Sequence, residues 1–108
     1  MNIQEEFSAG SFEINYEISD DPSPSISATI YMGEDTVSSF ILSEEDTRSA
    51  EYSNPTLDQN LSCEVYYLPA KDGEKGLFRF NRLNYTERNM APLVLTNFIL
   101  CEYDDTIN

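Results

Sequence analysis

The sequence lacks histidine and tryptophan, and only 6 of its 108 residues are lysine or arginine. Histidine is the side chain most often used in general acid–base catalysis, and a Ser–His–Asp triad requires it. A pair of carboxylates can hydrolyse glycosides, but a chain this small rarely encloses a sugar cleft as well as a core. We therefore expect no catalytic residues, and a protein that is not an enzyme.

Cysteine and glycine are also scarce. The two cysteines, Cys63 and Cys101, form no C-x-x-C pair, and without histidine they cannot complete a zinc site. Four glycines form no phosphate-binding loop, and the acidic clusters lack the alternating ligand spacing of an EF-hand. We expect no metal site and no cofactor, and we expect both thiols to be reduced core residues.

No segment approaches the roughly 18 consecutive apolar residues that a membrane-spanning helix needs. The acidic N-terminus has no apolar region typical of a secretory signal, which predicts a cytoplasmic protein. Direct binding to nucleic acid or to an anionic membrane is disfavoured, because such binding depends on lysine and arginine neutralising phosphates.

Alternation of apolar and polar residues is the main pattern present, and it is typical of half-buried antiparallel strands. With 40% hydrophobic residues, the chain can form one acidic β domain over residues 1–108. We predict about six strands in an antiparallel sandwich or partly open barrel, with at most one short helix. The predicted strands cover residues 12–18, 26–32, 37–42, 61–68, 77–83 and 93–103.

Two segments depart from simple alternation. Residues 43–60 are polar, and we expect either a short helix over 44–52, ending before Pro55, or an ordered loop. Residues 93–103 are apolar on both faces, which predicts a strand in the middle of a covered sheet, or one that bends across two packed sheets.

Charge is distributed unevenly along the chain, whose formal net charge is −14. Residues 1–47 contain eleven acidic residues and no basic one, whereas residues 71–88 contain five of the six cations. Such acidity can simply keep a small domain soluble. Alternatively, it forms the binding surface for a basic partner, because complementary charge accelerates association.

This profile of a small, acidic chain without catalytic residues resembles, in composition only, bacterial immunity proteins against nuclease toxins and phage anti-defence proteins. The resemblance implies a non-enzymatic inhibitor, in a bacterial cell or a phage-infected host, that blocks a basic nuclease toxin or nucleic-acid-binding effector. A nucleic-acid mimic is a special case of this reading. We expect carboxylates to steer the partner and tyrosines to supply contact energy. The candidate partner-binding residues are Glu13, Glu17, Asp20, Asp21, Tyr31, Glu34, Asp35, Glu44, Glu45, Asp46 and Tyr66.

Two other functions fit the same sequence. One is a structural or assembly module of a phage or secretion system, in which the apolar last strand pairs with another copy. The other is a β domain that binds a small ligand or calcium. An inhibitor is expected to be a monomer or a small homo-oligomer, and a stable homo-oligomer favours assembly.

Overall fold

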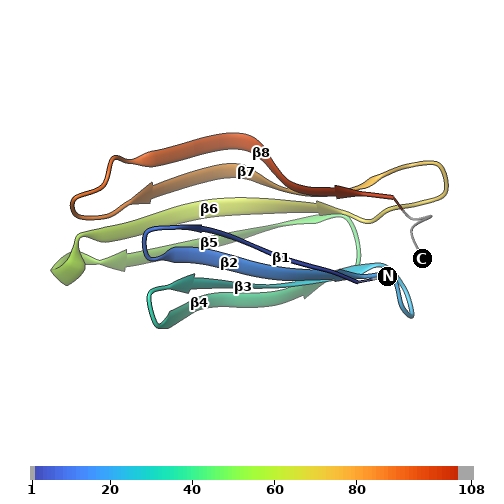
Figure 1. Cartoon of the computed structure of the whole chain (residues 1–108), viewed down its shortest axis with the longest axis horizontal. Coiled ribbons are helices and arrows are strands. Elements are labelled where there is room, and N and C mark those ends of the chain that lie inside the picture. Colours follow the sequence, from blue (N-terminus) through green and yellow to red (C-terminus); the bar gives the residue numbers. More distant parts are fainter. Residues whose placement is uncertain (1, 105–108) are drawn as a thin grey trace.

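Two four-stranded antiparallel sheets pack face to face in the computed structural model, which describes residues 2–104 (Figure 1). Sheet A, in chain order, contains β1 (Asn2–Ala9), β2 (Phe12–Ser19), β3 (Ser25–Met32) and β4 (Asp35–Leu42). Sheet B contains β5 (Asp46–Asn54), β6 (Gln59–Leu68), β7 (Gly76–Thr86) and β8 (Leu93–Tyr103), with the 3-10 turn η1 (Pro55–Leu57) between β5 and β6. The predicted all-β sandwich is confirmed.

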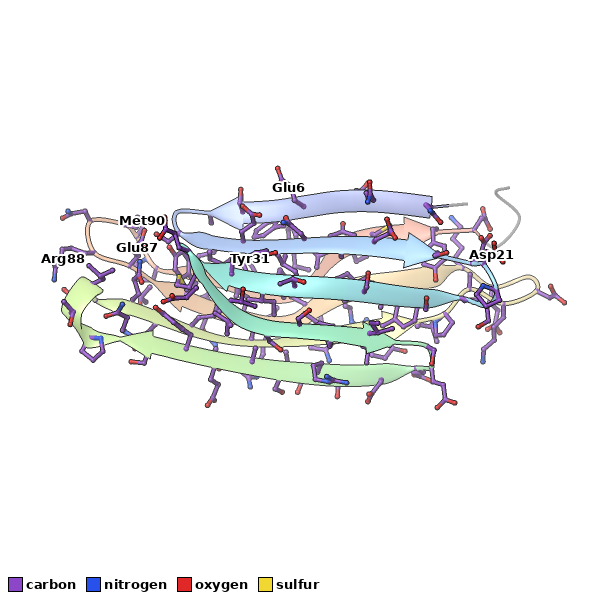
Figure 2. All side chains as sticks on the ribbon, turned by 90° about the horizontal axis from the view of Figure 1, so that it is seen from below. Glu6, Asp21, Tyr31, Glu87, Arg88 and Met90 are labelled. Carbon is purple, nitrogen blue, oxygen red and sulfur yellow. The ribbon has the colours of Figure 1, made fainter. Side chains whose placement is uncertain are left out.

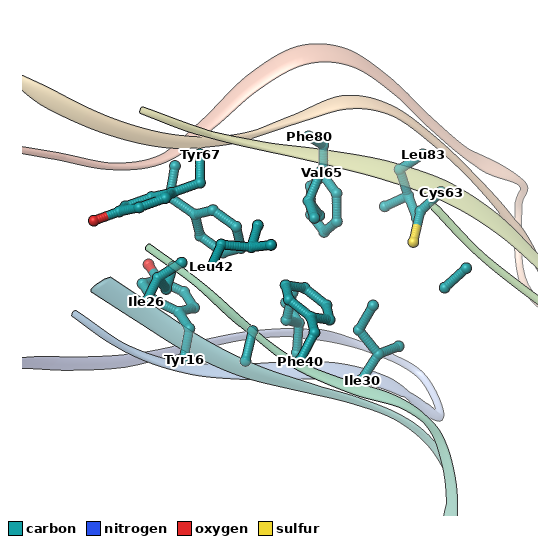
Figure 3. Packing of buried hydrophobic residues seen from close by; sticks show 14 of the residues in the cluster. Tyr16, Ile26, Ile30, Phe40, Leu42, Cys63, Val65, Tyr67, Phe80 and Leu83 are labelled. Carbon is teal, nitrogen blue, oxygen red and sulfur yellow. The ribbon is translucent and has the colours of Figure 1, made fainter. Parts of the chain in front are cut away.

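Alternating residues form the core as the sequence pattern predicts. In β2, Phe12, Ile14, Tyr16 and Ile18 are buried, while Glu13, Asn15 and Glu17 face outward. In β6 the same alternation buries Cys63 and Val65 against the opposite sheet (Figure 3). Because each sheet has one apolar and one polar face, packing the two apolar faces together leaves two polar outer faces.

Each sheet is a simple meander, so the two sheets share two lateral edges. At one edge β4 leads directly into β5, and the Arg48 guanidinium lies 5.2 Å from the centre of the Phe40 ring. At the other edge β1 lies beside β8, where the Phe7 and Phe98 ring centres are 5.5 Å apart. The molecule measures 47 × 23 × 19 Å, and β1 begins at the end of its long axis where β8 finishes (Figure 1).

The count of about six strands is wrong, because eight are present. β1 has a regular alternation broken by Glu5, which occupies a core-facing position opposite Tyr16. β5 replaces the helix or loop expected over residues 43–60, although only Ala50 in it is fully buried. Both are edge strands, whose conformation is fixed by pairing with a neighbour more than by their own apolar residues.

The predicted central position of residues 93–103 is also wrong. β8 has the expected bounds, but it is an edge strand next to β7. Val94 and Ile99 remain 63% and 54% exposed, and only Tyr103 is buried. Apolar residues on both faces therefore do not mark a covered strand here, because no segment within residues 2–104 covers the outer face of sheet B.

Both cysteines are free thiols. Cys63 is buried in the core, where burial raises its pKa to about 11. Cys101 lies on β8 and is only partly buried, so the expected core position is confirmed for Cys63 alone. Residues 2–104 form no helix with the length and apolar character needed to cross a bilayer.

Candidate functional site

The uneven charge of the sequence becomes a difference between the two sheets. Residues 2–45, which form sheet A and its connections, contain ten acidic residues and no basic one. Residues 46–103, which form sheet B, contain eight acidic residues and all six cations. The carboxylates of sheet A therefore have no basic side chain within their own layer.

The outward-facing polar side chains of sheet A form one surface, which we call the acidic face. Its centre is β2, where Glu13, Asn15 and Glu17 occupy the positions between buried residues. Tyr31 on β3 pairs directly with Glu13 and is partly buried (Figure 2). The full set of residues in the acidic face is Gln4, Glu6, Glu13, Asn15, Glu17, Ser27, Thr29, Tyr31 and Ser39.

An open hollow of about 510 Å³ lies on the acidic face around Asn15. Gln4 closes one side of it by donating a hydrogen bond from Nε2 to the Glu17 carboxylate at 2.6 Å. The Asn15 Oδ1 atom is shielded from solvent and accepts no hydrogen bond from any described residue. With carboxylates around it, the hollow is rich in acceptors, so it suits ligand groups that only donate, such as ammonium and guanidinium.

A second group of predicted residues meets at the end of the sandwich where β1 starts. Asp20 and Asp21 lie in the β2–β3 connection, and Glu44, Glu45 and Asp46 lie in or directly after the β4–β5 connection. A shared depression is lined by Ser23 of the first connection and by Glu44 and Glu45 of the second. Five carboxylates that are up to 26 positions apart in sequence thus gather at one end.

The remaining predicted residues lie elsewhere. Glu34 and Asp35 are at the β3–β4 turn, at the opposite end of the sandwich, where Asp35 Oδ2 accepts a hydrogen bond from the Tyr52 hydroxyl at 2.9 Å. Tyr66 is on the outer face of sheet B, so it shares no surface with Tyr31.

Tyr66 is held by two neighbours on that face. Its hydroxyl donates to Glu45 Oε2 at 2.6 Å, and the Arg79 guanidinium lies 4.6 Å from its ring centre. The hydrogen bond to Glu45, with desolvation as a smaller cause, raises the pKa of Tyr66. These two neighbours hold the Tyr66 ring on the outer face of sheet B.

Sequence reasoning missed Gln4, Glu6 and Asn15. The alternation of β2 already predicts that Asn15 faces outward. An outward-facing amide between two glutamates, however, carries no sequence signal that marks it as a binding residue. Gln4 and Glu6 were missed because β1 was not recognised as a strand. Once β1 is paired with β2, the register places Gln4 opposite Glu17 and Glu6 opposite Asn15.

Within residues 2–104, no three His, Cys, Asp or Glu side chains are grouped so that they could hold a metal ion. Comparisons of the chain with protein-family models, curated proteins and solved structures found no match.

Proposed function

We propose that this protein is a non-enzymatic binding protein of the inhibitor type, which docks its acidic face onto a cationic surface of a partner. The observation that carries the proposal is that sheet A and its connections, residues 2–45, contain ten carboxylates and no basic residue. A basic protein that processes or binds nucleic acid is the class of partner that fits, because its own active surface must attract phosphates.

The electrostatic cost of sheet A supports this reading. Glu13 and Glu17 flank Asn15 on the same face of β2, each two residues away from it. Glu6 lies opposite Asn15 on the neighbouring strand β1. Carboxylates this close repel each other and oppose the compact state, unless cations approach from outside. A partner that brings lysine or arginine to the face removes this repulsion. The repulsion is present in the free protein and is relieved in the complex, so it favours binding.

The acidic face is also preorganised. Its side chains are on paired strands, and the opposite side of the same strands is the fully buried core of Phe12, Ile14 and Ile18. Little conformational freedom is then lost on binding, which favours affinity. Tyr31 supplies a rigid aromatic contact beside Glu13, as residues of this type do at the centres of interfaces.

The test is affinity capture from lysate of cells that naturally contain the protein, first at low and then at raised salt. Three immobilised proteins are compared: the wild type, the variant Glu13→Lys/Glu17→Lys, and the control Glu51→Lys/Glu74→Lys. The control changes two exposed glutamates away from sheet A, Glu51 on β5 and Glu74 in the β6–β7 connection, so the net charge changes equally in both variants.

The proposal predicts that the wild type and the control retain the same basic protein, and that raised salt releases it. The Glu13→Lys/Glu17→Lys variant is expected to lose that protein. Recovery of nothing, of acidic proteins only, or of a partner that the variant still retains would contradict the proposal. Circular dichroism of all three proteins verifies that they are folded.

A further inference from the structure

The free side of β8 is an apolar strand edge. From Leu93 to Cys101 the strand has no charged residue, and Val94, Phe98 and Ile99 are exposed to solvent. Its backbone pairs with β7 on one side only. Exposed apolar edge strands invite pairing with another strand, and soluble proteins usually protect them with charges.

The opposite lateral edge of the sandwich is closed by its own side chains. Arg48 of β5 reaches across to the Phe40 ring of β4, and the Tyr52 hydroxyl of β5 donates to Asp35. At the β1/β8 edge the apolar side chains between the sheets are only partly covered. They are Ile3, Phe7, Leu93, Leu95, Leu100 and Cys101. An occupant is therefore expected at the β1/β8 edge.

We propose that this occupant is a second copy of the chain, joined edge to edge about a two-fold axis parallel to the strands. β1 and β8 run in opposite directions (Figure 1), and the contact between Phe7 and Phe98 places them at the same edge. Rotation about such an axis places β8 of each copy beside β1 of the other, again antiparallel. Both exposed edges are then paired at once, and sheet B of one copy continues into sheet A of the other.

The same symmetry fixes the register, because rotation about an axis parallel to the strands keeps every residue at its own level. The Phe7 ring contacts the Phe98 ring, and the single Tyr16 hydroxyl proton lies within hydrogen-bond reach of Glu5 Oε2 at 2.7 Å and of the Leu100 carbonyl oxygen at 3.0 Å. Glu5 is thus level with Leu100, and Phe7 with Phe98. Glu6 of the second copy must then lie opposite Ile99.

Arg79 makes this position complementary in charge. It is the residue on β7 that pairs with Ile99, so its side chain lies on the outer face, one strand away from the expected position of Glu6 of the second copy. Its Nε donates to Asn81 Oδ1 at 2.9 Å and its guanidinium stacks on Tyr66. Among the described residues no carboxylate forms an ion pair with it, although the chain has 20 acidic residues.

The pairing is expected over the second half of β8. Asn97 has a left-handed backbone, with φ of 52°, which interrupts the strand before Phe98. Residues 98–103 follow this irregularity and contain a bulge at Leu100, because Ile99 pairs with Arg79 and Cys101 with Phe78. Before the bulge, residues 98–100 lie level with residues 5–7 of β1. This short pairing, formed twice by symmetry, gives the interface its backbone hydrogen bonds. The centre of the acidic face, at Glu13 and Glu17, remains free.

A charge on β1 opposes this dimer. Glu5 points between the sheets at the edge and accepts a hydrogen bond from the Tyr16 hydroxyl at 2.7 Å. In the dimer this carboxylate enters the closed gap together with the same group of the second copy. The Glu5→Gln variant keeps an acceptor for Tyr16 but removes both charges, so we expect it to dimerise more tightly than the wild type. Weaker association of Glu5→Gln would contradict the arrangement.

The decisive experiment measures mass by sedimentation equilibrium from about 1 µM to about 1 mM, because dimerisation follows mass action. The wild type is expected to reach twice 12.3 kDa. Glu6→Arg and Arg79→Glu are each expected to weaken the dimer by about tenfold or more, and the double variant to restore it. The control Glu13→Arg changes the same sheet away from the edge and should leave the dimer unchanged.

A monomer throughout the concentration range, a dimer that neither reversal weakens, or a double variant without recovery would overturn the proposal. Amide hydrogen exchange gives a second readout that does not depend on the variants. Raising the wild-type concentration should slow exchange in residues 5–7 and 98–100 and leave β4 and β5 unchanged. Concentration-independent exchange, or slowing confined to β4 and β5, would equally refute it. Because Glu13→Lys/Glu17→Lys tests the acidic face separately, the two proposals can fail independently.

Discussion

The side chain of Tyr103, the last residue of β8, covers one end of the core. Its hydroxyl lies 3.0 Å from that of Tyr67 and accepts a hydrogen bond from the Ala70 backbone nitrogen at 3.3 Å. Its ring packs against the backbone of Gly76, the first residue of β7. Burial, together with the hydrogen bond between the two hydroxyls, strongly raises the pKa of Tyr67, so the Tyr67 hydroxyl keeps its proton at physiological pH.

Replacing Gly76 with alanine should therefore be costly. A Cβ atom there would lie 2.3 Å from carbons of the Tyr103 ring, which cannot swing away without losing its hydrogen bonds. We expect Gly76→Ala to lower the free energy of unfolding by about 1–3 kcal/mol, as overpacking generally does. Urea denaturation measures this change. Thr86→Ala, at the exposed far end of β7, is the control and should cost about 0.5 kcal/mol or less.

Glu87 plays the corresponding role at the other end of the sandwich. Hydrogen bonds from the Ser11 side chain, then from Gln59 and Tyr85, lower the pKa of the Glu87 carboxyl, outweighing the opposing effect of desolvation. The Gln59 Nε2 donates to Glu87 at 2.7 Å, and the Tyr85 hydroxyl accepts from the Ser11 backbone nitrogen at 3.0 Å. The carboxylate joins the β1–β2 turn to the start of the β7–β8 connection.

This arrangement predicts a pH dependence. Because the folded pKa lies below the ordinary value of 4.5, the contribution of Glu87 is fully present above pH 4.5 and is lost as the pH falls through the folded value. Urea midpoints measured from neutral pH into the acid range should fall more steeply for the wild type than for Glu87→Gln. Parallel curves for the two proteins would show that these hydrogen bonds contribute nothing to stability.

Among the elements, strands that carry their own apolar residues could be predicted, and strands that depend on a neighbour could not. β2, β3 and β6 bury every second residue, and their pattern was sufficient. β5 buries only Ala50, so nothing in its sequence distinguishes it from a polar loop. For β8 the strand itself was predicted, but its position in the sheet was wrong. Apolar residues on its outer face suit an interface as well as a core.

The edge position of β8 can be checked by replacing single side chains with alanine. Leu83 on β7 is fully buried, whereas Val94 on β8 is 63% exposed. At micromolar concentration, Leu83→Ala should cost about 2–5 kcal/mol of folding free energy through the cavity it leaves. Val94→Ala should cost about 0.5 kcal/mol or less, as exposed substitutions do. Comparable losses at the two positions in urea denaturation would place β8 inside a covered sheet after all.

At the scale of the whole molecule, the sequence revealed the charge imbalance but not its geometry. A run of acidic residues without cations predicts a negative region, but folding residues 2–45 into one sheet places only Glu6, Glu13 and Glu17 on its outer face and most of the other carboxylates at its ends. The division of the predicted binding set was not foreseeable. Tyr31 and Tyr66 occupy equivalent outward positions in their strands, and only the assignment of those strands to opposite sheets separates them.

The most direct measurement of the central claim is the association rate with the captured partner as a function of salt. For the wild type, and for the Glu51→Lys/Glu74→Lys control, the account predicts a rate that falls steeply as salt rises. For Glu13→Lys/Glu17→Lys it predicts a rate about tenfold or more lower at low salt, with a flatter salt dependence. Equal rates and equal salt dependence for all three proteins would show that the acidic face of sheet A is not the docking surface.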